Sequence, residues 1–186
     1  MRILAVSGSL REGSFNTSLL RAAIEAAPEG VELELWEGIG ELPLYDEDLE
    51  GDDVPESARR LREDWAAADA ILFSTPEYNG SVPGGLKNAV DWASRPRIGA
   101  VLRNKPIAVV GASTGQFGAL WAQQDLKRIL GIAGARVVGT EIPVSRAEEH
   151  FDAEGRLLDG EIFEQLRLHL TTLASEAVPA PDRVAA

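Results

Sequence analysis

Residues 1–27 read MRILAVSGSLREGSFNTSLLRAAIEAA and contain the pattern that decides the fold. A short apolar run over residues 3–7 leads into a loop of small and polar residues, and the loop leads into residues 17–27. In this last stretch the apolar residues recur with the 3.6-residue period of an amphipathic helix. The stretch therefore predicts a strand, a loop and a helix, in the order that opens an α/β protein.

The same alternation continues along the chain. Further strands are expected over residues 31–36, 70–75, 106–112 and 135–143. Further helices are expected over residues 56–68, 85–94, 120–133 and 161–177. Short apolar strands separated by helices predict a parallel sheet that is covered on both faces.

Two segments fall outside this alternation. Residues 38–53 are acidic and irregular, and we expect a surface excursion there. Residues 178–186 contain two prolines and no periodicity, which predicts a flexible tail. Residues 1–177 are then expected to form one domain.

Composition narrows the class of protein. The chain has 186 residues, 45% of them hydrophobic, which suits one globular domain. A net charge of −12 argues against a nucleic-acid or anionic-membrane partner. No apolar stretch approaches the roughly 20 residues that span a bilayer, and the start lacks a signal-peptide pattern, so we expect a cytoplasmic protein. The chain has no cysteine, and its two histidines are far from the loops described next, so no metal site is expected.

The first loop, GSLREGSFN over residues 8–16, has the composition of an anion site. A strand that passes through Gly and Ser into a helix presents free backbone amides and the positive end of the helix dipole. Hydroxyl, amide and guanidinium groups can add to these donors, and they belong to Ser9, Arg11, Ser14, Asn16 and Thr17. The alternative is a plain turn and helix cap with one exposed arginine.

Two other phosphate motifs are disfavoured. Gly8 and Gly13 match the two glycines of a Walker loop, but Ser14-Phe15 stands where Lys-Ser/Thr is required. The Rossmann fingerprint G-x-G-x-x-G is absent as well. Nucleotide hydrolysis and dinucleotide binding in the Rossmann manner are therefore not expected.

The second loop, PEYNGSVPG over residues 76–84, combines three turn signals. Pro76 stiffens the end of the preceding strand, Asn79-Gly80 is typical of a tight turn, and Pro83 opens the next helix. Such a rigid turn can aim backbone amides at a ligand edge, while Tyr78 offers a flat surface for packing. Alternatively this is only a turn, with Glu77 in solvent.

A third loop, GASTGQFG over residues 111–118, follows the fourth strand at the same predicted edge of the sheet. It is rich in small residues and opens a helix, so it can close the far side of a ring-shaped pocket. Alone it is a weak signal, because its glycines can serve the turn only.

Together the three loops resemble one known family. The patterns GSLRxxSxN, PEYNGSxPGxLKNAxDW and GASxG are similar to those of the NADPH-dependent FMN reductases, the flavodoxin-like group that includes quinone, chromate and azo-dye reductases. The similarity spans about residues 1–143. It implies a flavodoxin-like three-layer sandwich with a five-stranded parallel sheet of order 2-1-3-4-5, and FMN bound where the strand order reverses.

The resemblance also implies roles for individual residues. The phosphate would be held by Ser9, Arg11, Ser14, Asn16 and Thr17. The isoalloxazine ring would be bordered by Pro76, Glu77, Tyr78, Asn79 and Gly80, and its pyrimidine side by Ser113 and Gly115. Thr114 departs from the small residue or proline that relatives often carry. Relatives are usually homodimers or homotetramers, to which the helices after the second and third strands often contribute.

Two functions from different classes are compatible with these residues. The first is an enzyme that passes hydride from NADPH or NADH through bound FMN to a quinone-like or other small acceptor, with no side chain acting as acid or base. The second is a flavodoxin-like electron carrier whose acidic surface docks to a redox protein partner. A flavin-free interaction module would require all three loops to be coincidental turns.

Overall fold

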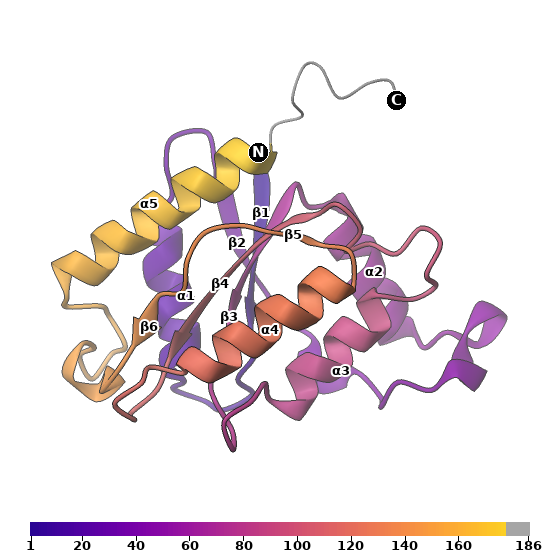
Figure 1. Ribbon diagram of the computed structural model, residues 1–186, viewed down its shortest axis with the longest axis horizontal. Helices are drawn as coiled ribbons and strands as arrows, with labels where there is room; N and C mark the ends of the chain where they lie inside the picture. Colours follow the sequence, from indigo (N-terminus) through magenta and orange to yellow (C-terminus); the bar gives the residue numbers. More distant parts are fainter. Residues whose placement is uncertain (178–186) are drawn as a thin grey trace.

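The computed structural model describes residues 1–177, in which strands and helices alternate (Figure 1). The strands are β1 (Arg2–Ser7), β2 (Glu32–Trp36), β3 (Ala70–Ser74), β4 (Pro106–Ala112), β5 (Arg136–Val137) and β6 (Pro143–Val144). The helices are α1 (Phe15–Glu25), α2 (Glu56–Ala67), α3 (Gly84–Ala93), α4 (Leu120–Ile132) and α5 (Gly160–Ala177). The predicted tail, residues 178–186, lies outside the described residues. No helix within residues 1–177 is long and apolar enough to cross a membrane.

The sheet has the predicted topology. Its strands run parallel in the order β2-β1-β3-β4-β5, and β6 pairs with the end of β4. In β1, Leu4 lies between Glu34 of β2 and Ile71 of β3. The chain moves to one side after β1 and to the other after β2, so the topological switch point lies at the carboxyl ends of β1 and β3.

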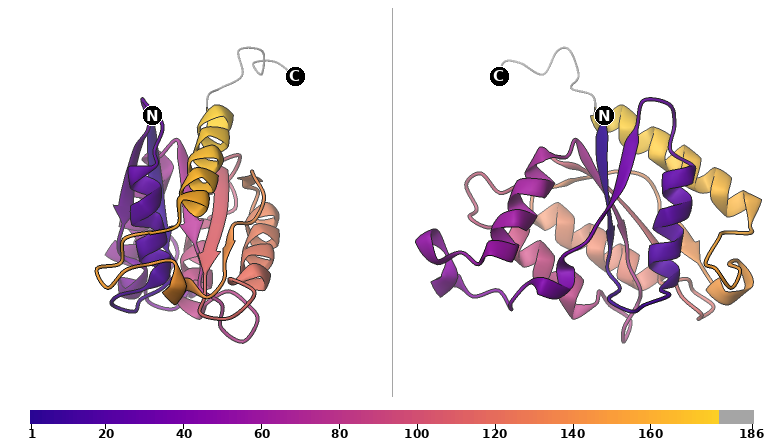
Figure 2. Two further views of the ribbon diagram at one scale, coloured as in Figure 1. Left: turned by 90° about the vertical axis from the view of Figure 1, so that its left-hand side faces the viewer. Right: turned by 180° about the vertical axis from the view of Figure 1, so that it is seen from behind.

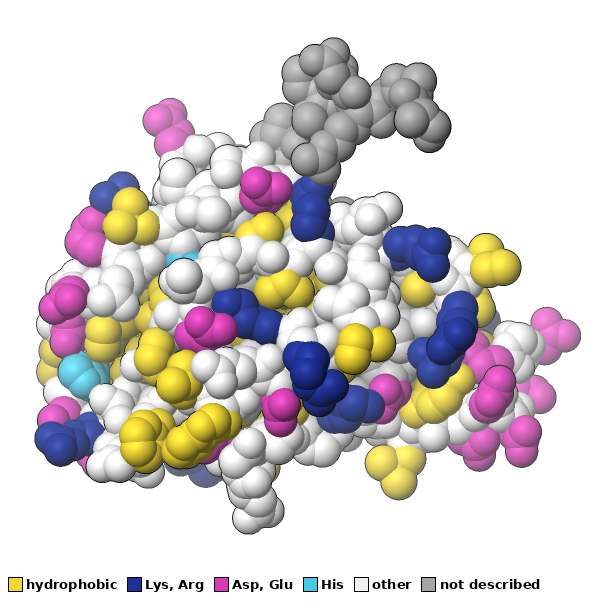
Figure 3. All heavy atoms as spheres, in the orientation of Figure 1, with side chains coloured by type: hydrophobic (Ala, Val, Ile, Leu, Met, Phe, Trp, Pro, Cys, Tyr) yellow, Lys and Arg dark blue, Asp and Glu magenta, His cyan; other side chains and the backbone are white. Residues whose placement is uncertain are grey.

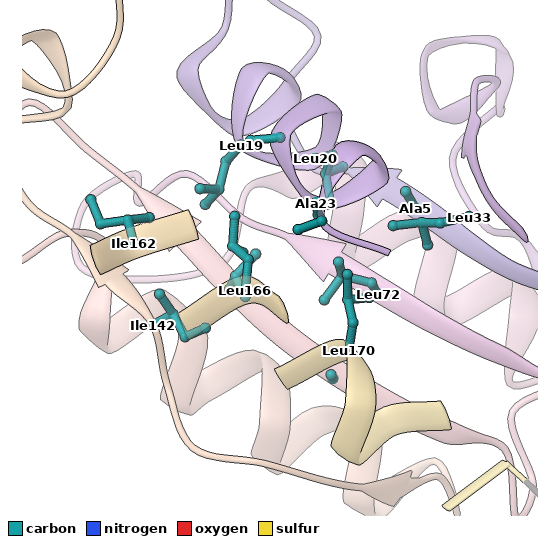
Figure 4. Close-up of a cluster of buried hydrophobic side chains, with 14 of the residues drawn as sticks. Ala5, Leu19, Leu20, Ala23, Leu33, Leu72, Ile142, Ile162, Leu166 and Leu170 are labelled. Atoms are coloured by element: carbon teal, nitrogen blue, oxygen red, sulfur yellow. The ribbon is translucent and has the colours of Figure 1, made fainter. Parts of the chain in front are cut away.

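Alternating side chains of each strand belong to two separate hydrophobic cores, because successive residues of a strand point to opposite faces of the sheet. In β3, Leu72 joins the core under α1 and α5, whereas Phe73 joins the core under α2, α3 and α4. Figure 2 shows these helix layers on the two sides of the sheet. Figure 4 shows Leu166 and Leu170 of α5 facing Leu19 and Leu72. The predicted sandwich of three layers is confirmed.

The fifth strand differs from its prediction as one continuous element over residues 135–143. It is split into β5 and β6, and residues 139–141 leave the edge of the sheet between them. Gly139 has φ of 74°, and a Cβ at this position would lie 2.3 Å from Cε1 of His169 in α5. The bend requires glycine because any side chain at this position would collide with the His169 ring.

Residues 38–53 form the predicted surface excursion. They contain three short 3₁₀ turns, Ile39–Glu41, Glu47–Leu49 and Gly51–Asp53, and project beyond α2 and α3 (Figure 1). The segment is anchored to α3 at its base, since the Asn88 carboxamide bonds the Tyr45 N–H and the Pro43 carbonyl, 2.8 and 2.9 Å away.

One buried side chain ties the first helix to the switch point. The Asn16 carboxamide accepts hydrogen bonds from the Ala112 N–H at 3.0 Å and the Ser74 hydroxyl at 2.9 Å. Its nitrogen donates to the Ala112 carbonyl at 2.9 Å. Asn16 thereby fixes the start of α1 against the ends of β3 and β4.

Replacing Asn16 with alanine should lower the free energy of unfolding by about 3 kcal/mol, because each buried polar group left unpaired costs about 1–3 kcal/mol. Urea denaturation measures this loss. Asn88→Ala removes the same chemical group beside the excursion, where water reaches the freed partners, and should cost less. Equal losses in the two variants would contradict the central role given to Asn16.

Acid should weaken the fold through His169. Burial and then the Lys127 ammonium group lower the pKa of His169 from 6.5 to about 4. As pH falls below 6.5, the unfolded chain takes up a proton that the folded chain excludes, so the free energy of unfolding drops. Between about pH 7 and about pH 5, protonation of His169 in the unfolded chain lowers the free energy of unfolding by on the order of 2 kcal/mol. His169→Gln should show a pH dependence of stability that is shallower by this amount, and an unchanged slope would contradict the assignment.

Candidate active site

The loops that follow β1, β3 and β4 meet at the carboxyl edge of the sheet, the lower edge in Figure 1. Residues of all three loops line one cavity of about 410 Å³. The predicted site residues in its lining are Ser9, Arg11, Ser14, Asn16, Pro76, Glu77, Tyr78 and Ser113. The structure thus joins three segments that are far apart in the sequence, although four predicted residues lie outside this lining: Thr17, Asn79, Gly80 and Gly115.

The first loop surrounds the N-terminus of α1. The Ser14 hydroxyl caps the helix by accepting from the Asn16 N–H at 3.2 Å, and no acidic residue lies in the first turn. The Thr17 hydroxyl lies 2.9 Å from that of Ser7 and lines a second depression of about 390 Å³, which shares Ser9, Arg11 and Ser14 with the cavity. Backbone amides, hydroxyls and the helix dipole therefore converge where the two depressions meet.

Arg11 is a free cation that lines both the cavity and the second depression. Its guanidinium lies 5.9 Å from the centre of the Phe15 ring and donates to the Glu12 carbonyl at 3.3 Å. Within residues 1–177, no carboxylate forms an ion pair with it. A guanidinium that lies over an aromatic ring without an acidic partner is available to an anionic ligand.

Asn16 reaches the cavity wall, but its carboxamide is largely committed to the bonds with Ser74 and Ala112. One N–H of the amide has no partner among the described residues, so a contact between Asn16 and phosphate stays a prediction. Phe15 and Ala112 also line the cavity and were missed by sequence reasoning. The position of Phe15 between Ser14 and Asn16 could have identified it as a lining residue, whereas nothing in the local sequence identifies Ala112.

The second loop forms the predicted tight turn. Tyr78 and Ser81 exchange two backbone hydrogen bonds of 3.1 Å, and Asn79 and Gly80 between them have φ of 53° and 74°. Two positive φ angles are those of a type I′ turn, which Asn-Gly favours. Asn79 and Gly80 form the tip of the hairpin, so they shape the loop without entering the lining.

Side chains pin this hairpin to α4. The Glu77 carboxylate accepts from the Ala122 N–H in the first turn of α4 at 3.1 Å, and the Ser81 hydroxyl donates to Asp125 at 2.8 Å. Glu77 is therefore engaged at a helix N-terminus, where a carboxylate is favoured. The alternative interpretation of this loop placed Glu77 in solvent, whereas the structure shows its carboxylate bonded to Ala122.

The third loop is also held in place, by hydrogen bonds within it and to the segment that follows β6. The Ser113 hydroxyl accepts from the Gly115 N–H at 3.0 Å, and the Ser113 and Gly115 carbonyls accept from the N–H groups of Ala147 and Arg146 at 3.1 Å. Further along, Gly118 has φ of 56°, and a Cβ there would lie 2.5 Å from the Pro143 carbonyl carbon. These contacts fix the loop without any bound ligand.

The site contains no combination of side chains typical of acid–base or metal catalysis. Among residues 1–177, no group of three or more His, Asp or Glu side chains is placed to hold a metal ion. His150 bonds Asp159 at 2.9 Å, and His169 is packed against Gly139, so neither histidine faces the cavity. The arrangement is suited to binding and orienting a ligand.

Comparisons with known proteins agree with this geometry. The family model described as NADPH-dependent FMN reductase matches residues 1–149. A NAD(P)H-dependent FMN reductase of Pseudomonas aeruginosa is 44% identical over 174 residues, covering 93% of each chain. A 2-hydroxy-1,4-benzoquinone reductase of a Burkholderia species is 39% identical over 92% of this chain and 91% of its own.

A solved structure is similar over nearly the whole chain. The flavoenzyme NAD(P)H:(acceptor) oxidoreductase FerB of Paracoccus denitrificans has a TM-score of 0.81 and 34% identity, covering 94% of this chain and 98% of its own. The family match, the curated relatives and this structure agree with one another and with the three-loop cavity. The chain therefore belongs to the NADPH-dependent FMN reductase family.

Proposed function

We propose that this protein is an NAD(P)H-dependent oxidoreductase that binds FMN in the three-loop cavity and passes hydride from NADPH or NADH to a quinone-like or other small acceptor. The observation that carries the proposal is the cavity itself, which unites an anion site at one end with a rigid hairpin at the other. The names of the relatives, FMN reductase and benzoquinone reductase, support it.

The first loop fits a phosphate monoester. Ser9, Ser14 and Thr17 offer hydroxyl donors, Asn16 offers one amide N–H, and Arg11 offers a forked cation. The N-terminus of α1 adds its dipole. Charge-assisted bonds of this kind are about twice as strong as neutral ones, which suits a doubly charged group on a chain of net charge −12.

The second and third loops fit a flat ring with polar edges. Pro76, Glu77 and Tyr78 line one side of the cavity and Ser113 the other, and we propose that their backbone groups bond the ring edge. Asn79 and Gly80 would hold the hairpin in shape, and Gly115 the loop opposite. Because these loops are already fixed by bonds to other elements, little ordering free energy would be lost on binding.

Bound FMN would supply the hydride transfer, as cofactors generally supply the difficult chemistry. The chain would contribute binding, orientation and fixed dipoles around the ring. We propose no catalytic side chain, since none in the lining is arranged as an acid–base pair. Tyr78, about half exposed, borders the cavity and offers a flat surface to reactants.

The alternative is a flavodoxin-like electron carrier. The acidic surface is compatible with a basic redox partner, but the relatives named above are reductases of small molecules. We further propose that residues 1–177 act as one FMN-binding domain, that the protein is a homodimer or homotetramer, and that it works in the cytoplasm.

The phosphate end can be tested with two ligands. Arg11→Ala should weaken FMN binding to the apoprotein about tenfold or more, because a charge-assisted bond contributes about 1.5–3 kcal/mol. Riboflavin, which lacks the phosphate, should bind both proteins equally. Arg167→Ala on the exposed face of α5 is the matched control. The assignment of Arg11 fails if riboflavin loses as much affinity as FMN, as titrations of flavin fluorescence will measure.

Anaerobic mixing of the FMN-loaded protein with NADPH and with NADH distinguishes the enzyme function from the electron-carrier function. We expect rapid loss of flavin absorbance with at least one of them, followed by recovery when a benzoquinone is added. Absorbance that persists with both donors while FMN stays bound would favour the carrier. Failure to bind FMN at all would overturn both functions.

A further inference from the structure

The exposed aromatic side chains of this chain gather at one corner of the molecule. Within residues 1–177, the only exposed aromatic residues are Tyr78, Phe117 and Trp121. They belong to the second loop, the third loop and the first turn of α4. Figure 3 shows hydrophobic side chains side by side at the lower edge of the molecule, where α4 begins. We call Phe117 and Trp121 the aromatic pair.

Hydrogen bonds between the second loop and α4 place Trp121 beside the three-loop cavity. Glu77 of the cavity lining accepts from the N–H of Ala122, the residue that follows Trp121, at 3.1 Å. One turn after Trp121, Asp125 accepts from the Ser81 hydroxyl at 2.8 Å. Residues four apart lie on the same face of a helix. Trp121 therefore lies on the side of α4 that carries the hairpin of the second loop.

Phe117 belongs to the third loop, which forms another wall of the cavity. Ser113 and Thr114 of this loop line the cavity, and Phe117 follows Thr114 by three positions. The next residue, Gly118, is held by the buried Gln123 side chain of α4, whose amide donates to the Gly118 carbonyl at 3.1 Å. The loop therefore carries Phe117 from the cavity wall to the start of α4, next to Trp121.

The two rings support each other and still leave aromatic surface free. Their centroids are 4.7 Å apart and their planes are inclined by 53°. Tilted aromatic pairs at this separation are favourable, so each ring helps to hold the other. Phe117 is 46% exposed and Trp121 is 47% exposed. An aromatic side chain has only two torsions, so such a surface can bind a ligand at a low cost in conformational entropy.

Packing of the hydrophobic cores does not account for the aromatic pair. Among the described residues, neither Phe117 nor Trp121 belongs to either core, whereas Trp36, Trp65 and Trp92 are all buried. A protein partner is a poor match for so small a surface, because a standard interface buries about 800 Å² on each partner. Two half-exposed rings instead match the size of a flat molecule of a few fused rings.

We infer that the aromatic pair binds the electron acceptor and selects flat acceptors with two or more fused rings, such as naphthoquinones. A flat neutral ring system stacks on an exposed aromatic face, whereas a single-ring quinone covers less of it. A compact anion has no face to stack and is disfavoured by a chain of net charge −12. The quinone accepts a hydride from the reduced flavin and a proton from solvent, and leaves as the hydroquinone. The inference rests on the proposed function and narrows its class of acceptor.

Binding without turnover tests the aromatic pair directly. The oxidised, FMN-loaded protein is titrated with the two-ring quinone menadione in the absence of NADPH and NADH. Quenching of tryptophan fluorescence reports binding at this corner, because Trp121 is the one exposed tryptophan among residues 1–177. Phe117→Ala keeps this reporter and should raise the dissociation constant about fivefold or more, the effect of losing one ring contact. Phe117→Tyr should restore binding.

Reoxidation of the reduced protein gives a second measurement. The protein is reduced anaerobically and mixed with menadione or with ferricyanide, which is octahedral and cannot stack. The ratio of the two second-order rate constants should fall about fivefold or more in Trp121→Ala and recover in Trp121→Phe. Leu168→Ala removes an exposed apolar side chain from α5 and should change neither this ratio nor the binding of menadione. An unchanged ratio in Trp121→Ala would overturn the inference.

Two other results would assign the aromatic pair a different role. If Trp121→Ala slows reduction of the flavin by NADPH or NADH and leaves reoxidation unchanged, the pair binds the electron donor. If Trp121→Ala lowers the mass measured by sedimentation and leaves both rates unchanged, the pair is a contact between copies. Either result contradicts the acceptor assignment while the proposed function stands. A protein that binds no FMN contradicts the proposed function, and its absorbance spectrum shows this before any acceptor is added.

Discussion

The Asn16 carboxamide is the contact on which the candidate site depends. Backbone pairing sets the positions of β1, β3 and β4, but it leaves the loops beyond their ends undetermined. Asn16 bonds the hydroxyl of Ser74 at the end of β3 and both backbone groups of Ala112 at the end of β4. It also lies in the first turn of α1. Since buried polar groups are costly to leave unpaired, the end of the first loop is fixed relative to the starting points of the other two.

Hydrogen bonds from the second and third loops to neighbouring elements extend this rigidity to the cavity. Glu77 bonds the first turn of α4, and the Ser113 and Gly115 carbonyls bond the segment after β6. Each loop is therefore held by an element outside the cavity, while Arg11 and the hydroxyls of the first loop remain available to a ligand. A site built in this way is organised before the ligand arrives, which lowers the entropic cost of binding and fixes the dipoles that act on a bound ring.

Local patterns predicted the features that depend on local residues. Alternation predicted a parallel sheet and the resemblance implied its strand order, and Asn79-Gly80 predicted a turn whose two positive φ angles the structure confirms. Features that depend on distant residues had no local signal. Gly139 breaks the fifth strand against His169, which is thirty positions further along the chain. The side chain of Asn16 turns to Ala112, and that of Glu77 to Ala122, each because of a partner that no local period reveals. The uneven distribution of charge, with six carboxylates in residues 46–53, is likewise invisible in a net charge.

That uneven distribution explains how a chain of net charge −12 would hold the phosphate that we propose. Six of the carboxylates lie in residues 46–53, which project beyond α2 and α3, whereas the first loop, the proposed phosphate site, lies at the carboxyl edge of the sheet (Figure 1). At physiological ionic strength, exposed charges separated by more than about 8 Å are largely screened from one another. The overall charge therefore acts mainly on the approach of an anion. The stability of a bound anion depends instead on donors at contact distance, namely the Arg11 guanidinium and the amides at the start of α1. No carboxylate of the described chain forms an ion pair with Arg11.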